Sequence, residues 1–222
     1  MGYYLAGLIE GNGNINIPAL SNTSLDRILN PIIVFTGDKD NLQLYGYIQH
    51  RLGYKGRFQL VNGNTIRYII GDIEGIKSLI NLIHNKLRTP KNITFNKLIE
   101  FFNNKYYIIE SSKLDTSNIL NNYWFSGFTE ADGSFQIKIV DSKPKSETRK
   151  RSVSENISLR FILNQGLYDK PTSSTMLSIM KEIAKSLSSN LNIYKTNKGN
   201  ETLCITVTSI NKLKMVVYYF SK

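Results

Sequence analysis

The chain has 222 residues, of which 41% are hydrophobic, enough to form a core in one domain or in two small ones. Its formal net charge of +11 predicts a polyanionic partner, nucleic acid above all, with an anionic membrane as the weaker alternative. The single cysteine, Cys204, excludes a disulfide scaffold and a cysteine-rich zinc site, and no apolar run is long enough for a transmembrane helix.

Two similar stretches of sequence organise the chain. Residues 5–13 read LAGLIEGNG, and residues 125–133 read FSGFTEADG. Each stretch predicts a short apolar helix with small residues four positions apart, which lie on one helix face and let two backbones approach closely. These small residues are Gly7 and Gly11 in the first copy, and Gly127 and Ala131 in the second. We therefore predict two related halves whose motif helices pack together, each helix stopping at the glycine that follows it.

The elements of the first half follow from alternation, turn residues and helical spacing. They are strands at 14–17 and 31–36, a helix at 39–52, strands at 54–60 and 65–70, and helices at 73–87 and 94–104. Asn62-Gly63-Asn64 is a strong hairpin signal between the last two strands. Residues 111–122 are polar and have no period, so they predict a linker between the halves.

The second half repeats this order. After its motif helix come strands at 134–140 and 157–163, a helix at 172–187, strands at 191–196 and 202–208, and a helix from 210. The equivalents of residues 86–105 do not follow, so we expect a truncated second half.

Asp132 occupies an unfavourable position in the last turn of its motif helix, because a carboxylate there faces the negative end of the helix dipole. A divalent cation at the meeting point of two helix ends would explain the acid. A single copy of the motif would be an ordinary buried helix with a glycine cap. Two copies, each followed by an alternating strand, resemble the LAGLIDADG family of homing endonucleases and group I intron maturases.

The resemblance implies a metal site at the ends of the motif helices. In that family the eighth motif residue is the metal-binding acid, which is Asp132 in the second copy and Asn12 in the first. Asn12 keeps an oxygen ligand but not the charge that holds a hard cation. The implied ligands are Asp132 and Asn12 with their neighbours Gly11 and Ala131, and the implied cofactor is Mg²⁺, for which Ca²⁺ or Mn²⁺ could substitute. We expect cleavage to be weakened or lost, on one strand or both, while folding and nucleic-acid binding survive.

Two further site residues are implied by the same resemblance. Gln165 resembles the polar residue that orients the attacking water, and Arg88 resembles the basic residue of the solvent pocket. The first half has Gly37 at the position of Gln165. We expect Glu10 and Glu130, the other motif acids, to be structural rather than catalytic.

The polar strand positions predict contacts to DNA bases. Each half should form an antiparallel sheet with one face on helices and one exposed. Polar side chains on the exposed face can reach base edges in a major groove, although a merely solvated face is the alternative. These residues are Asn14, Asn16, Arg57, Gln59 and Arg67 in the first half, and Ser134, Gln136, Lys138, Ser158, Arg160, Thr202, Thr206 and Thr208 in the second.

The loop at 142–154 is strongly basic. It carries Lys143, Lys145, Arg149, Lys150 and Arg151. Charge this dense predicts an arm that contacts phosphates, with a solvated loop as the alternative.

Together these features predict an α/β (α+β) fold of two pseudo-symmetric αββαββα halves with saddle-shaped sheets, at 1–110 and 123–222, joined by the linker 111–122. The expected function is an intron-encoded homing endonuclease, acting as a monomer on a long double-stranded DNA site. The alternatives are a non-cleaving maturase that binds its own group I intron RNA, and a DNA-binding protein without a catalytic role. The abundance of Asn, Ile, Lys and Tyr is typical of AT-rich coding DNA and suits a mitochondrial origin.

Overall fold

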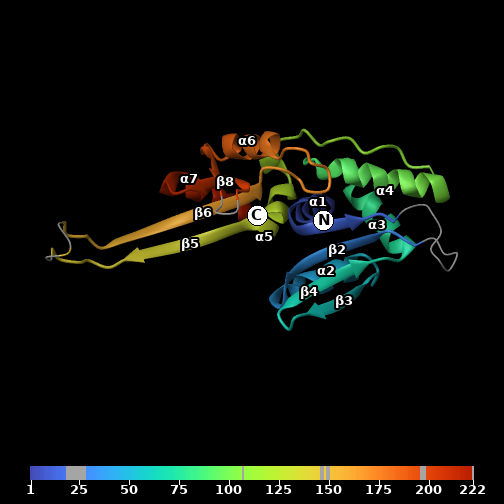
Figure 1. Ribbon diagram of the computed structural model, residues 1–222, viewed down its shortest axis with the longest axis horizontal. Helices are drawn as coiled ribbons and strands as arrows, with labels where there is room; N and C mark the ends of the chain where they lie inside the picture. Colours follow the sequence, from blue (N-terminus) through green and yellow to red (C-terminus); the bar gives the residue numbers. More distant parts are fainter. Residues whose placement is uncertain (19–28, 107, 146–147, 149–150, 196–198, 222) are drawn as a thin grey trace. The chain divides into compact units, whose positions relative to one another are not determined.

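The computed structural model describes residues 1–18, 29–106, 108–145, 148, 151–195 and 199–221 (Figure 1). Contacts group the chain into two units, Met1–Asp132 with Tyr168–Met176, and Gly133–Leu167 with Leu177–Lys222. Both motif helices therefore belong to the first unit. The predicted start of the second half at residue 123 describes the repeat in the sequence, and it stays a prediction.

The first unit has the predicted order of elements, with a short 3₁₀ turn before its second helix. Its helices are α1 (Gly2–Asn12), η1 (Lys39–Asn41), α2 (Leu42–Arg51), α3 (Ile73–Ile83), α4 (Lys91–Lys105), η2 (Ile119–Asn121) and α5 (Trp124–Asp132). Its strands are β1 (Gly13–Asn16), β2 (Ile32–Asp38), β3 (Arg57–Val61) and β4 (Thr65–Ile70).

The second unit repeats this pattern. Its elements are β5 (Gly133–Val140), β6 (Asn156–Gly166), α6 (Leu177–Ser186), β7 (Leu191–Lys195), β8 (Glu201–Val207) and α7 (Ile210–Phe220). In the described parts of the chain the strands form two antiparallel sheets of four, ordered β1-β2-β4-β3 and β5-β6-β8-β7. None of the described helices is long and apolar enough to cross a membrane.

The pairing register shows which positions of the two sheets are equivalent. Gly13 lies opposite Phe35 in the first sheet, and Gly133 lies opposite Leu163 in the second. Two residues further along these strands stand Gly37 and Gln165, so the predicted correspondence of these two positions is confirmed by the register of each sheet.

Local chemistry explains two turns. The predicted hairpin is confirmed: Val61 pairs with Thr65, and in the three-residue loop between them Asn62 and Gly63 have left-handed φ values of 50° and 72°. The helix α1 stops at Gly13, as predicted, and the backbone of Gly13 is extended, with a φ of −85° and a ψ of 152°. Glycine is needed there for space, since an added Cβ would lie 2.4 Å from Ile9 Cγ1.

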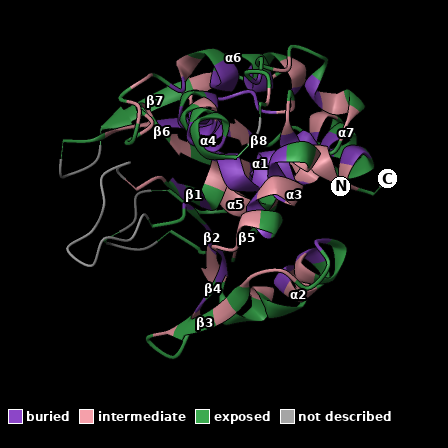
Figure 2. Ribbon diagram, turned by 90° about the vertical axis from the view of Figure 1, so that its right-hand side faces the viewer, coloured by how far each residue is buried: buried purple, intermediate pink, exposed green. Residues whose placement is uncertain are grey.

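The core of the first unit lies around α1, whose residues from Leu5 to Glu10 are all buried (Figure 2). All six positions are enclosed because α5, α3 and the sheet each contact this helix. On the sheet, Tyr45 of α2 packs with Phe35 and Tyr68, with ring centroids 6.1 to 6.4 Å apart.

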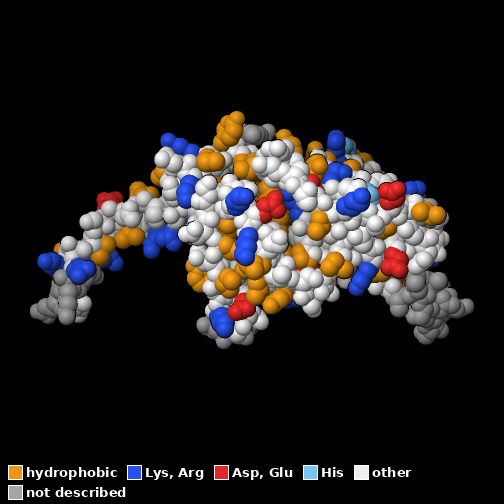
Figure 3. Space-filling model, turned by 90° about the horizontal axis from the view of Figure 1, so that it is seen from above, with side chains coloured by type: hydrophobic (Ala, Val, Ile, Leu, Met, Phe, Trp, Pro, Cys, Tyr) orange, Lys and Arg blue, Asp and Glu red, His pale blue; other side chains and the backbone are white. Residues whose placement is uncertain are grey.

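The second sheet departs from the expected division into a covered face and an exposed face. Ile137, Ile139 and Ile157 are 72%, 63% and 62% exposed, although they alternate with polar neighbours. Figure 3 shows hydrophobic and basic side chains side by side along this β5–β6 arm. Alternation fixes which residues share a face, but burial also needs an element to cover that face, and no described element of this unit covers the outer part of the arm.

Several predicted boundaries differ from the observed ones: the strand expected at 54–60 is β3, Arg57–Val61, and the helix expected at 94–104 is α4, Lys91–Lys105. The helix expected from 172 begins at Leu177, because Thr172 donates from its amide and hydroxyl to Asp169 Oδ2, and Ser173 has a φ of 56°. The helix expected to reach 87 ends at Ile83. Thr208 lies just beyond β8.

The predicted linker belongs to the first unit and packs closely against α4 and the segment before it. The Ser112 carbonyl accepts from Asn92 and Asn96 of α4, and Asp115 N donates to the Leu87 carbonyl. Ser112 is 4% exposed, so this segment is part of the folded structure rather than a loose connection.

Candidate active site and nucleic-acid interface

The two motif helices meet through their glycines. A Cβ added at Gly7 would lie 1.9 Å from the Trp124 carbonyl oxygen, and one added at Gly127 would lie 1.9 Å from the Tyr4 carbonyl oxygen. Only glycine allows this backbone contact, which is reciprocal between the two copies. The predicted close packing of the motif helices is confirmed (Figure 1).

The C-terminal ends of these helices also touch. A Cβ on Gly11 would lie 2.4 Å from Ala131 Cβ and 2.8 Å from Asp132 Oδ2. The last turn of α1 therefore lies directly against the carboxylate of Asp132. The structure brings together four of the predicted site residues, Gly11, Asn12, Ala131 and Asp132.

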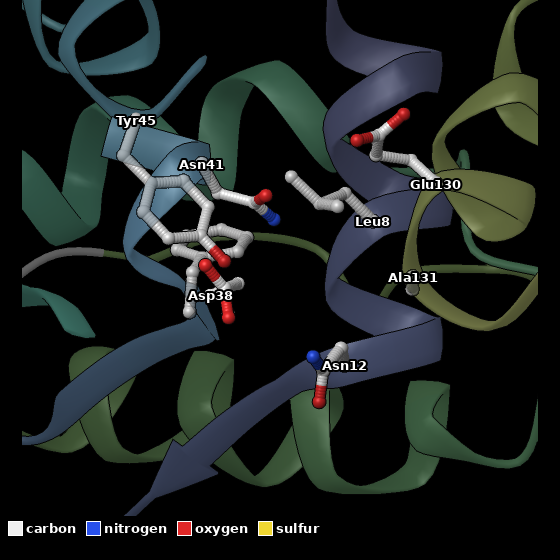
Figure 4. Close-up of a pocket in the computed structure, with 9 residues that line it drawn as sticks. Leu8, Asn12, Asp38, Asn41, Tyr45, Glu130 and Ala131 are labelled. Atoms are coloured by element: carbon white, nitrogen blue, oxygen red, sulfur yellow. The ribbon is translucent and has the colours of Figure 1, made fainter. Parts of the chain in front are cut away.

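Asn12 is held by a hydrogen bond that its side-chain amide donates. Its Nδ2 donates to the Thr36 carbonyl oxygen at 2.5 Å, which joins the end of α1 to β2. Figure 4 shows the amide oxygen on the opposite side of the group. A carboxylate at this position would place an oxygen against the carbonyl, so the local structure is suited to Asn rather than Asp.

A small polar pocket of 160 Å³ lies beside Asn12 (Figure 4). Its lining residues are Leu8, Asn12, Phe35, Gly37, Asp38, Asn41, Tyr45, Glu130 and Ala131. A Cβ added at Gly37 would lie 2.6 Å from Tyr45 Oη and 2.7 Å from Asn41 Nδ2. In the first half these two side chains occupy the space that a larger residue at position 37 would need.

Glu10 accepts hydrogen bonds from two separate segments of the chain. Its carboxylate accepts from the amides of Arg88 and Thr89, from the Thr89 hydroxyl at 2.7 Å, and from Trp124 Nε1 at 2.5 Å. Burial raises the pKa of the Glu10 carboxyl, while the bonds from Thr89, Trp124 and Arg88 lower it. The residue is 3% exposed, in agreement with the expected structural role.

Lys91 of α4 lies at the C-terminal end of α1. Its Nζ donates to the carbonyl oxygens of Ile9, Glu10 and Gly13 at 2.8, 3.0 and 2.7 Å. Burial lowers the pKa of Lys91, and the negative charges of Glu10, Asp169 and Asp132 raise it, in that order.

The polar strand residues of the first half share one sheet face. Asn14 and Arg57 lie in one cross-strand row, through Val34 and Ile69, and Gln59 lies directly opposite Arg67. The five predicted residues of this half, Asn14, Asn16, Arg57, Gln59 and Arg67, are all exposed.

The second sheet also has a polar face. Gln136 lies opposite Arg160, Lys138 opposite Ser158, and Ser134 in a row with Thr206. Thr202 is on the same strand as Thr206 and points to the same face. Lys143, Lys145 and Arg151 of the basic loop are exposed, whereas Arg149 and Lys150 lie outside the described residues. DNA contact by either face, or by the loop, stays a prediction.

Comparison with known protein families decides the identity of the fold. The model of the LAGLIDADG endonuclease family matches residues 5–102 and again residues 125–222. The chain belongs to the LAGLIDADG endonuclease family. Its two motif copies are thus two copies of one family domain.

Individual relatives agree with this membership. The intron-encoded DNA endonuclease aI3 of Saccharomyces cerevisiae is 34% identical over 161 residues, which cover 66% of this chain and 38% of aI3. The intron-encoded RNA maturase bI4 of the same yeast is 33% identical over 132 residues, which cover 59% of this chain and 18% of bI4. The chain therefore spans much less than the full length of either protein.

Solved structures show the same fold. The LAGLIDADG homing endonuclease I-SmaMI, in a crystal structure with cleaved DNA, superimposes with a TM-score of 0.71 at 18% identity. The match covers 100% of this chain and 82% of the I-SmaMI chain. The predicted fold class is confirmed.

Arg88 does not lie where the family resemblance implied. Its guanidinium donates to Asp115 Oδ2 and to the Ser117 carbonyl, each at 2.5 Å, and its Cζ lies 5.5 Å from the centre of the Trp124 ring. The side chain is 1% exposed, so a role in a solvent pocket is not supported. Gln165 is a residue of the second unit, on β6, and its catalytic role stays a prediction.

Sequence reasoning missed Lys91, Asn41 and Tyr45. No pattern in the sequence marked Lys91, because the helix predicted at 94–104 begins after it, whereas α4 begins at Lys91. No local pattern connects Asn41 and Tyr45 with Gly37, because the contact depends on how α2 packs on the sheet.

The residues at the helix ends fit one divalent cation better than two. Asp132 provides a carboxylate, and Asn12 an amide oxygen that Thr36 does not use. The described residues contain no group of three or more His, Cys, Asp or Glu that could hold a metal ion, so backbone and amide oxygens must supply the other protein ligands.

Proposed function

We propose that this chain recognises a long, specific double-stranded DNA site and hydrolyses phosphodiester bonds there with the help of a divalent cation, as an intron-encoded homing endonuclease. We further propose that cutting is weak or confined to one strand. The contact of Gly11 with the Asp132 carboxylate, beside an Asn12 that is bonded to Thr36, carries this proposal. At this site the second motif copy contributes the carboxylate of Asp132, and the first copy contributes the neutral amide of Asn12.

Residues at the ends of the two motif helices would hold the cation. Asp132, with the oxygen of Asn12 and the backbone oxygens of Gly11 and Ala131, would hold the cation. Mg²⁺ is the proposed natural ion, with Ca²⁺ or Mn²⁺ as substitutes. A bound cation would polarise the scissile phosphate and stabilise the charge that develops during hydrolysis.

Recognition would use the two polar sheet faces. Their Asn, Gln, Arg, Lys, Ser and Thr side chains suit base edges in the major groove, and the net charge of +11 suits the phosphate backbone. Lys143, Lys145 and Arg151 are the exposed cations of the basic loop and would contact phosphates.

Selection from a random duplex library tests recognition separately from chemistry. With Ca²⁺ present, we expect the chain to enrich one long sequence, and the Asp132→Asn variant to enrich the same one. No enrichment of any duplex sequence would contradict DNA recognition.

A group I intron maturase is the second candidate, favoured by the similarity to bI4 and by the neutral Asn12. A maturase needs a binding surface but no metal acid, and it reads folded RNA mainly through shape and backbone. Tight binding of the host intron RNA, with no specific binding of duplex DNA, would establish this alternative. Both candidates are proteins encoded by introns, and the abundance of Asn, Ile, Lys and Tyr, which is typical of AT-rich coding DNA, supports a mitochondrial site of action.

A further inference from the structure

The hydroxyl group of Tyr45 is buried without an acceptor for its hydrogen. Tyr45 is 2% exposed, and among the described residues no acceptor takes the hydrogen of this group. Its ring neighbour Tyr68 does have one, because Tyr68 Oη donates to the Lys55 carbonyl oxygen at 2.6 Å. A buried tyrosine hydroxyl normally has a hydrogen-bond partner, so the partner of Tyr45 must come from the space beside it.

The surroundings of Tyr45 keep its hydroxyl protonated. Burial raises the pKa of this hydroxyl, a hydrogen bond from the Asn41 side chain lowers it, and the negative charge of Glu130 raises it, in that order. Since Asn41 donates to the hydroxyl oxygen, the hydroxyl hydrogen remains available as a donor.

The space beside this hydroxyl is the polar pocket of 160 Å³. Figure 4 shows the side chains of Tyr45, Asn41 and Asp38 gathered on one side of α1. A water molecule takes about 30 Å³ in the liquid, and a buried water makes two to four hydrogen bonds to polar groups. The pocket has room for a water and offers it the Tyr45 donor and the carboxylates of Asp38 and Glu130 as acceptors.

The internal repeat shows that the fold does not need a hydroxyl at this position. The hydrogen bonds that end α2 and α6 align Tyr45 with Met180, which is 0% exposed. These bonds run from Tyr54 N to the Gln49 carbonyl oxygen, and from Ser189 N to the Ala184 carbonyl oxygen. An apolar side chain fills the equivalent position in the second half, so packing alone does not explain the hydroxyl of Tyr45.

The two halves carry a polar group on different elements. At the equivalent strand position the first half has Gly37 and the second has Gln165. A Cβ added at Gly37 would lie 2.6 Å from Tyr45 Oη, so the hydroxyl occupies the space of the side chain that this strand lacks. The first half thus has on its helix the polar group that the second half has on its strand.

We propose that Tyr45 is a positioning residue for the reaction, whose hydroxyl donates to an ordered water in the pocket and holds that water beside the cation site. Asn12 and Ala131 line the pocket and also belong to the proposed cation site, so the two sites adjoin. The effect on cleavage rests on the proposed endonuclease function. The water site itself does not depend on that function.

The test compares Tyr45→Phe with Tyr68→Phe. Both substitutions remove one hydroxyl from the same cluster of aromatic rings, but Tyr68 donates to a backbone carbonyl and is not among the residues that line the pocket. Crystal structures of the unaltered chain and both variants, without DNA, show whether a water lies within hydrogen-bond distance of residue 45. Thermal unfolding, DNA affinity in Ca²⁺ and single-turnover cleavage in Mg²⁺ on the selected site are then measured.

In the unaltered chain and in Tyr68→Phe we expect an ordered water at Tyr45 Oη, and in Tyr45→Phe we expect this water to be lost. Tyr45→Phe should cleave DNA about tenfold or more slowly, with a change in DNA affinity below about threefold. Tyr68→Phe should cleave at the rate of the unaltered chain but show the larger fall in unfolding temperature, because it loses a direct hydrogen bond.

A crystal structure of the unaltered chain with no water at Tyr45 Oη would overturn the proposal. So would cleavage by Tyr45→Phe at the unaltered rate, or losses of rate in both variants that follow their losses of stability. If the unaltered chain cuts no DNA, the endonuclease function fails, and the crystal structures still decide whether Tyr45 holds a water.

Discussion

At the scale of single residues, Glu10 and Glu130 show how one motif position acquires two roles. Glu10 is 3% exposed and accepts from Arg88, Thr89 and Trp124. Glu130 is exposed and lines the polar pocket beside Asn12. Within the described residues, the donors to Glu10 come from two segments, Arg88-Thr89 and Trp124, so the difference comes from packing and not from the motif.

Glu10→Gln should destabilise the first unit by about 2–3 kcal/mol, because the new NH₂ group faces donors and the charge-assisted bonds are lost. Trp124 is the only tryptophan and donates to Glu10, so its fluorescence should change in the same variant. Glu130→Gln, at the same motif position, is the control and should alter stability by less than about 0.5 kcal/mol. Equal unfolding temperatures for the two variants would contradict this assignment.

At the scale of elements, glycine is required for close packing in one helix and is dispensable in another. At Gly7 of α1 an added Cβ would lie 1.9 Å from a backbone oxygen of α5, whereas at Gly46 of α2 it would meet nothing within 4 Å. Gly7→Ala should therefore cost about 3 kcal/mol or more by forcing the motif helices apart. Gly46→Ala should stabilise by about 0.5–1 kcal/mol through helix propensity.

Chemical denaturation of the two variants measures both effects. A Gly7→Ala protein as stable as the unaltered chain would mean that the motif helices are not in backbone contact.

The elements also show which structural features could be predicted from the sequence. The hairpin at Asn62 and Gly63 and the close approach at Gly7 were predictable, because each depends on residues next to one another or on one helix face. The environment of Arg88 was not, because Asp115 and Ser117 reach it from the predicted linker. The exposure of Ile137 could not be predicted from its alternating neighbours either, because burial depends on whether another element covers that face of the strand.

At the scale of the whole molecule, the net charge of +11 dominates the expected association with DNA. If the basic loop contacts phosphates, changing Lys143, Lys145 and Arg151 to Gln should reduce the salt dependence of DNA affinity, lowering the slope of log K against log salt by roughly 2 to 3. The preferred DNA sequence should not change. The matched control changes Lys97, Lys181 and Lys185, three exposed lysines on α4 and α6, and an equal loss of slope there would refute the loop's role.

The central claim is that only one motif copy has its metal acid. Strand-resolved cleavage in Mg²⁺ on the selected DNA site tests it most directly, comparing the unaltered chain with Asn12→Asp and Asp132→Asn. We predict that the unaltered chain nicks one strand at most, that Asp132→Asn cuts neither, and that Asn12→Asp gains cutting of the second strand despite losing its bond to Thr36. Efficient cutting of both strands by the unaltered chain would contradict the account.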